Sequence, residues 1–260
     1  IRKLKGIHFQ RVFNELLETG GKNKKGISTS SVNATRKYLK AAFEQAIKNG
    51  VVKNNAVAAT VAIKNIKAEI KILNFNQSNQ LLEAAKNFKV ETYGQVPYMF
   101  IRLALETGMR MGELLALQWD CIDLEKGIVF VKRAANTSKP SLNFQELKTQ
   151  KSIRQISLMK STIEALKKYE YWQNSHKNKL GDKYHDNGLV ITNIYGDILH
   201  PSNFTKRIFK PLLEIIGIEK SFRYHDLRHT HASHLLMMGI NPKVVQERLG
   251  HSTITILLNT

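Results

Sequence analysis

Apolar residues recur at helical spacing along most of the chain, and one stretch changes to the spacing of β-strands. The first two helical segments end at Gly20-Gly21 and Asn49-Gly50, and Ser28 to Ser31 offer N-caps for the second. Helices are expected over residues 6–17, 28–47, 56–63, 77–87, 97–106, 162–180, 201–216 and 242–249. The pattern predicts a mainly α-helical protein.

Residues 127–158 contain the predicted strands. Apolar residues fill Gly127–Lys132 and recur in Ser152–Leu158 as Ile153, Ile156 and Leu158. A polar segment at 136–143 and a turn at 148–151 predict two hairpins, with Lys148 at the tip of the second. We therefore expect a small three-stranded antiparallel sheet inside a mixed α+β domain. A lysine at a hairpin tip is usually only solvated.

The spacing and charge predict two domains. Residues 1–65 form a helical domain, residues 66–75 a charged linker, and residues 76–260 a larger domain. Residues 1–75 carry 15 Lys and Arg against 4 Asp and Glu, whereas the remaining residues carry 25 against 17. Basic charge is thus denser in the N-terminal part, which favours a helical module that lies against a phosphate backbone.

Composition narrows the class of partner. The chain has 40 Lys and Arg and 21 Asp and Glu, a formal net charge of +19, which makes nucleic acid the first partner to consider. One cysteine excludes an intramolecular disulfide and suits the cytoplasm. No apolar run is long enough to cross a bilayer, and the first residues given do not have the apolar h-region of a signal peptide, so no membrane partner is expected. The start at Ile1 rather than Met predicts a fragment.

Residues 224–234 place an arginine and several histidines at the predicted start of a helix. Asp226 is the expected N-cap, so His225 and Arg228 would lie near a helix N-terminus, where free N–H groups favour an anion. Arg110 lies in a turn between Gly108 and Gly112, three residues before Glu113. It either caps a helix or binds an anion, and the turn alone leaves both open.

Three functions compete for this cluster. A metal site could use His225 and His229, which are four residues apart, but no HExxH motif or cysteine ligand accompanies them, and arginines repel a cation. The histidines at 229, 231 and 234 could instead be structural. The third is catalysis on a phosphodiester, in which two arginines neutralise the phosphate oxygens and a lysine or histidine moves protons.

Four segments in order carry a resemblance to a known family. They are TGMRMGEL at residues 107–114, LKT at 147–149, HDLRHT at 225–230 and LGHS at 249–252. Together they resemble the tyrosine recombinases, and most of all the integrases of phages and conjugative transposons. The resemblance implies that residues 1–65 are a core-binding domain, residues 76–260 a catalytic domain, and that both form a C-shaped clamp around DNA.

The resemblance also implies the residue roles. Arg110 and Arg228 clamp the scissile phosphate, and Lys148 protonates the departing 5′ oxygen. His225 and His251 match the two active-site histidines, and Glu113 supports the catalytic fold. The implied reaction cleaves and rejoins DNA through a 3′-phosphotyrosyl intermediate, as in type IB topoisomerases. It needs no metal or nucleotide cofactor, because the arginines supply the positive charge.

In this family the nucleophilic tyrosine follows the Leu249-Gly250-His251 segment, and the sequence reaches Thr260 without one. Tyr224 precedes the clamp and is interpreted as a packing residue. The fragment is therefore expected to bind DNA without cleaving it, with the tyrosine directly after Thr260 and an arm-binding domain before Ile1.

The implied partners are the core sequences of an attachment site in double-stranded DNA, a homotetramer of the chain, and an accessory DNA-bending protein, in a bacterial nucleoid. Two alternatives remain open: a DNA-binding module without chemistry, and a ribonuclease that uses His, Lys and Arg.

Overall fold

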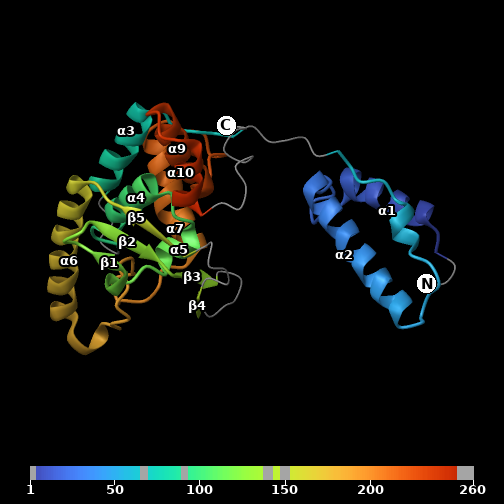
Figure 1. Ribbon diagram of the computed structural model, residues 1–260, viewed down its shortest axis with the longest axis horizontal. Coiled ribbons are helices and arrows are strands. Elements are labelled where there is room, and N and C mark those ends of the chain that lie inside the picture. The colour runs from blue at the N-terminus through green and yellow to red at the C-terminus, as the bar shows by residue number, and fades with distance from the viewer. Residues whose placement is uncertain (1–3, 65–69, 89–92, 137–142, 147–152, 251–260) are drawn as a thin grey trace. The chain divides into compact units, whose positions relative to one another are not determined.

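The structure, a computed structural model, describes residues 4–64, 70–88, 93–136, 143–146 and 153–250 (Figure 1). Its contacts divide the chain into two compact units, Ile1–Glu69 and Ile70–Thr260. The described part is mostly helical, as the spacing of apolar residues predicts. No described helix combines the length and the apolar character that a membrane span requires.

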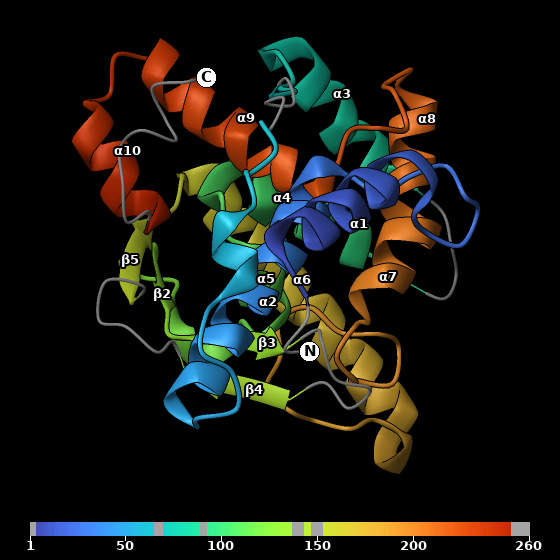
Figure 2. The same cartoon turned by 90° about the vertical axis from the view of Figure 1, so that its right-hand side faces the viewer.

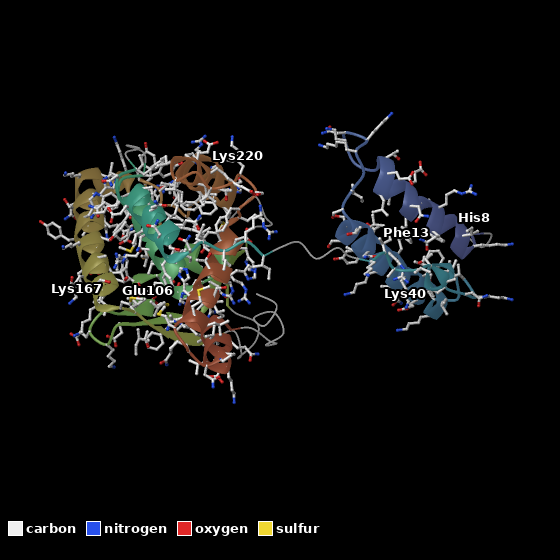
Figure 3. The ribbon with its side chains drawn as sticks, turned by 90° about the horizontal axis from the view of Figure 1, so that it is seen from above. His8, Phe13, Lys40, Glu106, Lys167 and Lys220 are labelled. Atoms are coloured by element: carbon white, nitrogen blue, oxygen red, sulfur yellow. The ribbon has the colours of Figure 1, made fainter. Side chains whose placement is uncertain are left out.

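The first unit contains α1 (Gly6–Thr19), α2 (Thr29–Lys48) and a short 3-10 helix (Ala56–Ala59). Its core is small, with Phe13, Val32 and Val57 fully buried between these elements. Figure 3 shows Phe13 inside this unit and His8 at its surface. The regular elements described in this unit are all helices, as predicted, but the helix expected over residues 56–63 is only the 3-10 helix Ala56–Ala59.

In the second unit, five helices correspond to predicted helices and one short helix follows Arg110. They are α3 (Phe75–Lys86), α4 (Val96–Thr107), α5 (Met111–Leu115), α6 (Lys160–Leu180), α9 (Tyr224–Met237) and α10 (Pro242–Leu249). The helix expected over residues 201–216 is divided into α7 (Pro201–Phe204), a π-helical turn (Thr205–Phe209) and α8 (Lys210–Ile215).

The predicted three-stranded antiparallel sheet is present, but its strands differ from the expected ones. It has the order β1 (Ile122–Asp123), β2 (Ile128–Val131), β5 (Arg154–Ser157). The segment between the two predicted turns instead pairs as a separate hairpin, β3 (Arg133–Asn136) with β4 (Asn143–Glu146). The turn at 148–151 lies outside the described residues.

The structure also shows which face of β5 is buried. Arg154 and Ile156 face inward, whereas Ile153, directly before the strand, is half exposed. The register Val129↔Ile156 explains this arrangement, because it places the inward residues of β2 and β5 on one face and the two-residue period then includes Arg154.

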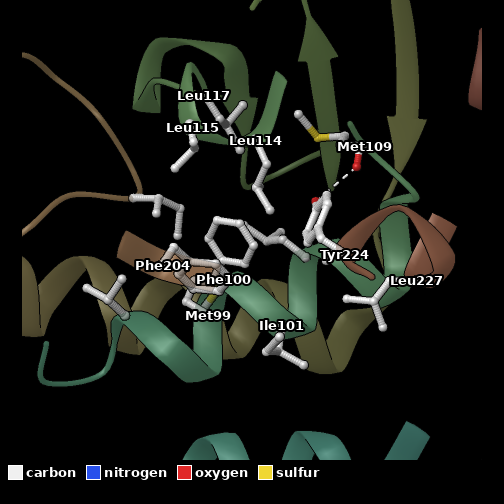
Figure 4. Close-up of a cluster of buried hydrophobic side chains, with 14 of the residues drawn as sticks. Met99, Phe100, Ile101, Met109, Leu114, Leu115, Leu117, Phe204, Tyr224 and Leu227 are labelled. Carbon is white, nitrogen blue, oxygen red and sulfur yellow. Dashed lines mark hydrogen bonds between the residues drawn. The ribbon is translucent and has the colours of Figure 1, made fainter. Parts of the chain in front are cut away.

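The core of the second unit is built around α4, of which nine of 12 residues are buried. Phe100 stacks on Phe204 with 3.7 Å between ring centroids, and the edge of Tyr224 meets it at 5.5 Å (Figure 4). The Tyr224 hydroxyl donates to the Met109 carbonyl at 3.0 Å. Tyr224 is therefore a packing residue, as predicted, and it ties the start of α9 to the residue before Arg110.

The chain before α3 is fastened to α9. The Leu73 N–H donates to Thr230 Oγ1 at 3.0 Å, and His234 Nε2–H donates to the Leu73 carbonyl at 2.9 Å. The Phe75 ring stacks on the His234 imidazole with 4.0 Å between centroids. These contacts give His234 a structural role and fix α9 against α3.

Candidate phosphate-binding site

The site begins where α4 ends. Gly108 terminates this helix with a left-handed φ of 60°. A Cβ at this position would lie 2.6 Å from Leu249 Cδ2 and 2.7 Å from His231 Cδ2, so only glycine allows α9 and α10 to pack this closely. The turn then brings Arg110 to the N-cap of α5.

The structure shows Arg110 at the start of a helix, the first of the two interpretations that the sequence left open. Its backbone N–H donates to Glu113 Oε2 at 2.9 Å, and its Nη1 donates to Glu113 Oε1 at 2.7 Å. Its side chain nevertheless remains 43% exposed, whereas the Glu113 side chain is 1% exposed. Arg110 is thus held at the helix start by Glu113 while its guanidinium stays accessible.

A second arginine, which the sequence analysis missed, binds the same carboxylate. Arg154 Nη2 lies 2.8 Å from Glu113 Oε2, and Arg154 Nη1 lies 3.2 Å from Oε1. Arg154 Nε donates to the Arg248 carbonyl at the end of α10 at 2.8 Å. The available signal was the strand period, since Arg154 precedes the apolar Ile156 by two residues and so shares its inward face.

The start of α9 differs from the expected one. The helix begins at Tyr224 with Arg223 as N-cap, and Asp226 is the third helical residue, where its carboxylate accepts from the Arg223 N–H at 2.7 Å. Asp226 therefore caps the helix from inside its first turn rather than as the N-cap residue. His225 and Arg228 still lie three residues apart on its first turns.

Arg228 is 1% exposed and donates to two backbone carbonyls. Its Nη1 lies 2.6 Å from Gly108 O, and its Nη2 donates to Leu249 O. Arg110 Nη2 reaches the adjacent Gly250 O at 3.4 Å. The two predicted clamp arginines, 118 positions apart in the sequence, therefore meet at the same Leu249-Gly250 turn. Figure 2 shows α10, which leads into this turn, beside α9 and next to β5.

The electrostatics of this cluster favour an anion. Burial and then the positive charge of Arg110 lower the pKa of Arg228 to about 9, so the side chain remains protonated at pH 7. Burial raises the pKa of Glu113, but the Arg154 and Arg110 bonds outweigh burial and keep the pKa below its usual value. Three guanidinium groups thus lie within electrostatic range of one carboxylate. The excess positive charge is what a phosphate would neutralise.

His225 lies beside these arginines in its neutral form. Its pKa is lowered by burial, by His229 and by Arg228, and its ring meets that of His229 edge-on at 5.1 Å. A neutral imidazole can accept a proton. Among the residues the structure describes, no group of His, Cys, Asp and Glu is arranged to hold a metal ion.

The structure brings together four of the six predicted site residues. Arg110 and Arg228 meet at the Leu249-Gly250 turn, Glu113 binds Arg110, and His225 lies within electrostatic range of both arginines. The other two predicted residues, Lys148 and His251, lie outside the described part of the chain.

His231 predicts a pH dependence of stability. It is buried with Nδ1–H donating to Leu105 O at 2.8 Å and Nε2 accepting from Arg248 Nε at 3.3 Å, and burial lowers its pKa to about 3. In the unfolded chain a histidine has a pKa of about 6.5, so it binds a proton below pH 6.5, whereas the buried His231 of the folded protein does not. The free energy of unfolding therefore decreases as the pH is lowered below 6.5. By pH 5.5 this group alone should cost about 1.4 kcal/mol.

Urea unfolding at pH 7.5 and pH 5.5, followed by tryptophan fluorescence, measures this difference. His231→Gln keeps a donor and an acceptor but cannot titrate, so the stability lost between the two pH values should shrink by about 1.4 kcal/mol. An unchanged pH difference in His231→Gln would contradict the assignment.

A mostly helical unit thus gathers three arginines around one carboxylate and one turn, an arrangement suited to binding an anion. The model of the phage integrase family matches residues 71–260, and the chain belongs to this family.

Two relatives illustrate the similarity in sequence. The chain is 30% identical over 274 residues to a tyrosine recombinase XerC-like protein of Caldanaerobacter subterraneus subsp. tengcongensis, with 98% of this chain and 66% of the relative covered. It is 27% identical over 230 residues to the ICEBs1 integrase of Bacillus subtilis, with 88% of this chain and 60% of the relative covered. The chain therefore spans less than two thirds of the length of these relatives.

Solved structures show the same fold. The Tn1549 transposon integrase in complex with transposon right end DNA superimposes with a TM-score of 0.81 at 23% identity, covering 100% of this chain and 81% of the other. A lambda integrase dimer bound to a COC' core site gives a TM-score of 0.64 at 22% identity, covering 99% and 64%. These similarities confirm the predicted fold class, mainly α with a small antiparallel sheet.

Proposed function

We propose that this chain is the core-binding and catalytic part of a site-specific DNA recombinase that integrates or excises a mobile element. The observation that carries the proposal is the convergence of Arg110 and Arg228 on the Leu249-Gly250 turn, with Glu113 as the nearby carboxylate. Such a pair can neutralise the two nonbridging oxygens of one phosphate as negative charge develops on them. Membership of the phage integrase family supports the same conclusion.

In the proposed reaction, a tyrosine hydroxyl attacks the scissile phosphorus and forms the 3′-phosphotyrosyl bond while the bond to the 5′ oxygen breaks. Lys148 donates a proton to that leaving oxygen, and neutral His225 is suited to accept the tyrosine proton. Arg110, Arg228 and His251 bind the phosphate, and Glu113 holds Arg110. We place the nucleophile directly after Thr260 in the full-length protein. The arginines take the role that a metal ion has in other phosphoryl-transfer enzymes, so no cofactor is proposed.

Double-stranded DNA is the proposed partner. The net charge of +19 supports this assignment, because each phosphate contact by Lys or Arg adds affinity that falls with salt. We assign residues 1–65 to a core-binding domain, residues 66–75 to a linker and residues 76–260 to the catalytic domain, which together enclose the duplex as a C-shaped clamp. A homotetramer, an accessory DNA-bending protein and a nucleoid location in the cytoplasm complete the proposal.

A nicked suicide substrate tests the reaction. Cleavage next to the nick releases a short strand whose loss prevents religation, so the full-length protein should accumulate as a covalent complex with DNA. Denaturing electrophoresis with end-labelled DNA detects it, and mass spectrometry should place the adduct on a tyrosine after Thr260.

The outcome separates two functions. A covalent complex that forms without added metal supports the recombinase. Salt-dependent DNA binding with no adduct, in a reading frame that stops without a tyrosine, would reject it in favour of a DNA-binding module. Cleavage of RNA but not DNA would indicate a ribonuclease.

A further inference from the structure

We infer that Arg154 is a positioning residue of this site, which keeps Arg110 available to the phosphate by occupying Glu113. The inference rests on the proposed function. It assigns a role to a side chain on β5 that need not touch DNA itself.

The first argument for this role is the set of hydrogen bonds to the Glu113 carboxylate. Each carboxylate oxygen receives one donor from Arg110 and one from Arg154: Oε1 accepts from both Nη1 groups, and Oε2 accepts from the Arg110 N–H and from Arg154 Nη2. Arg154 therefore forms a two-pronged pair with the carboxylate, the strongest geometry available to an arginine. Arg110 gives it only one side-chain bond and keeps the rest of its guanidinium for other acceptors.

The second argument is the balance of charge among Arg110, Arg154 and Glu113. The Glu113 side chain is 1% exposed and that of Arg154 is 5% exposed, so water screens their interaction weakly. With Arg154 present, two guanidinium charges share one carboxylate, and the group retains one positive charge. Without Arg154, Glu113 would neutralise Arg110 alone and draw its guanidinium inward. Arg154 thus neutralises Glu113, so that the positive charge of Arg110 remains available to an anionic ligand.

The third argument is the contact of Arg154 with the end of α10. Arg154 Nε bonds the Arg248 carbonyl, and the Arg154 side chain packs against Gly250, where a Cβ would lie 3.2 Å from Arg154 Cδ. Arg110 Nη2 reaches the carbonyl of the same Gly250. One buried side chain thereby fixes Glu113, the end of α10 and the turn that Arg110 and Arg228 share.

Arg154→Met in the full-length protein tests the inference. Covalent complex formation should fall about 100-fold, which is the usual effect of losing one preorganised group at a charged transition state. DNA affinity should stay within about threefold, because many other phosphate contacts supply it. Arg102→Met is the matched control, since Arg102 also makes three side-chain bonds, but its three partners are the hydroxyl groups of Thr162, Tyr98 and Ser161. Its cleavage should remain at the wild-type level.

A double variant separates positioning from support of the fold. If Arg154 acts by offsetting Glu113, then Arg154→Met combined with Glu113→Gln should cleave about tenfold faster than Arg154→Met alone, because Arg110 regains its charge. If the double variant instead cleaves more slowly than either single variant, by the product of their two fold-reductions, the inference is overturned. If Arg154→Met does not fold, Arg154→Gln replaces it in both comparisons, because glutamine is polar but, like methionine, supplies no charge to offset Glu113.

Modified substrates identify which group Arg154 serves. A methylphosphonate at the scissile position has a methyl group in place of one charged oxygen, so its cleavage depends less on neutralisation by Arg110 and Arg228. A 5′-bridging sulfur leaves without a proton and so needs Lys148 less. The methylphosphonate should recover most of the activity lost in Arg154→Met, and the bridging sulfur should not. The reverse pattern would overturn the role through Arg110. A wild-type protein that forms no adduct on any substrate would instead reject the proposed function.

Discussion

Arg228→Lys should reduce formation of the covalent DNA complex about 1000-fold, the upper range for removal of a preorganised donor at a developing charge. Arg228 is buried and donates from two separate nitrogens to Gly108 O and Leu249 O, which fixes the plane of its guanidinium. An ammonium group keeps the charge but cannot hold that planar geometry. Single-turnover cleavage of the suicide substrate, at saturating protein, measures the effect.

Arg223→Lys provides the matched control on the same helix. Arg223 is exposed and pairs with Asp226 at 3.1 Å, an interaction that a lysine can replace at the surface. Its cleavage rate should stay within about threefold of wild type. Wild-type cleavage in Arg228→Lys would contradict the clamp. A parallel loss of DNA affinity and folding would show that Arg228 acts only through the fold.

Phe100→Ala should lower the free energy of unfolding of the second unit by about 4 kcal/mol, as expected for removing a buried aromatic ring. Phe100 is fully buried, stacks on Phe204 and contacts Tyr224, the residue before His225. Trp119 and Trp172 both lie in the second unit, so tryptophan fluorescence during urea unfolding reports on that unit alone.

Phe75→Ala is the comparison for Phe100→Ala. Phe75 also stacks on an aromatic ring, that of His234, but its side chain borders solvent and the residue is 48% exposed. Its removal should cost less than about 1 kcal/mol. Equal effects of the two substitutions would show that the Phe100 ring does not organise the core in the way its contacts indicate.

The helices were the most predictable part of the fold. Their apolar residues recur at the period of an amphipathic helix, and capping residues such as Ser28 and Asn241 mark two of the starts. The π-helical turn Thr205–Phe209 was not predictable, because it interrupts a helix without changing the spacing of apolar residues.

The strands were less predictable because pairing is a long-range property. β1 has two residues and carries no periodic signal of its own, yet it forms the third strand of the sheet. The sequence did not indicate which face of β5 points inward, because Ile153 and Ile156 are three residues apart and cannot lie on the same face of a strand. A one-residue choice of register exchanges the two faces of a strand, and here it concealed Arg154.

In the site, the sequence predicted which residues carry charge but not how the charges are shared. The motif around Arg110 and the motif around Arg228 were visible separately, and only the fold brings both to the Leu249-Gly250 turn. Burial was equally hidden, since nothing in the local sequence distinguishes the enclosed Arg228 from the accessible Arg110.

The last peptide carbonyls of α10 have a consequence for ligand binding. A helix ends with carbonyls that lack partners within the helix, and here Arg154, Arg228 and Arg110 bond those of Arg248, Leu249 and Gly250. The negative end of the helix dipole is thereby held in part by Arg228 and Arg110, the two arginines that we propose bind the phosphate. Whenever an incoming anion takes one of these particular N–H groups, the corresponding carbonyl loses its donor. Occupancy of the site and fraying of the helix terminus are then linked equilibria, and each reports on the other.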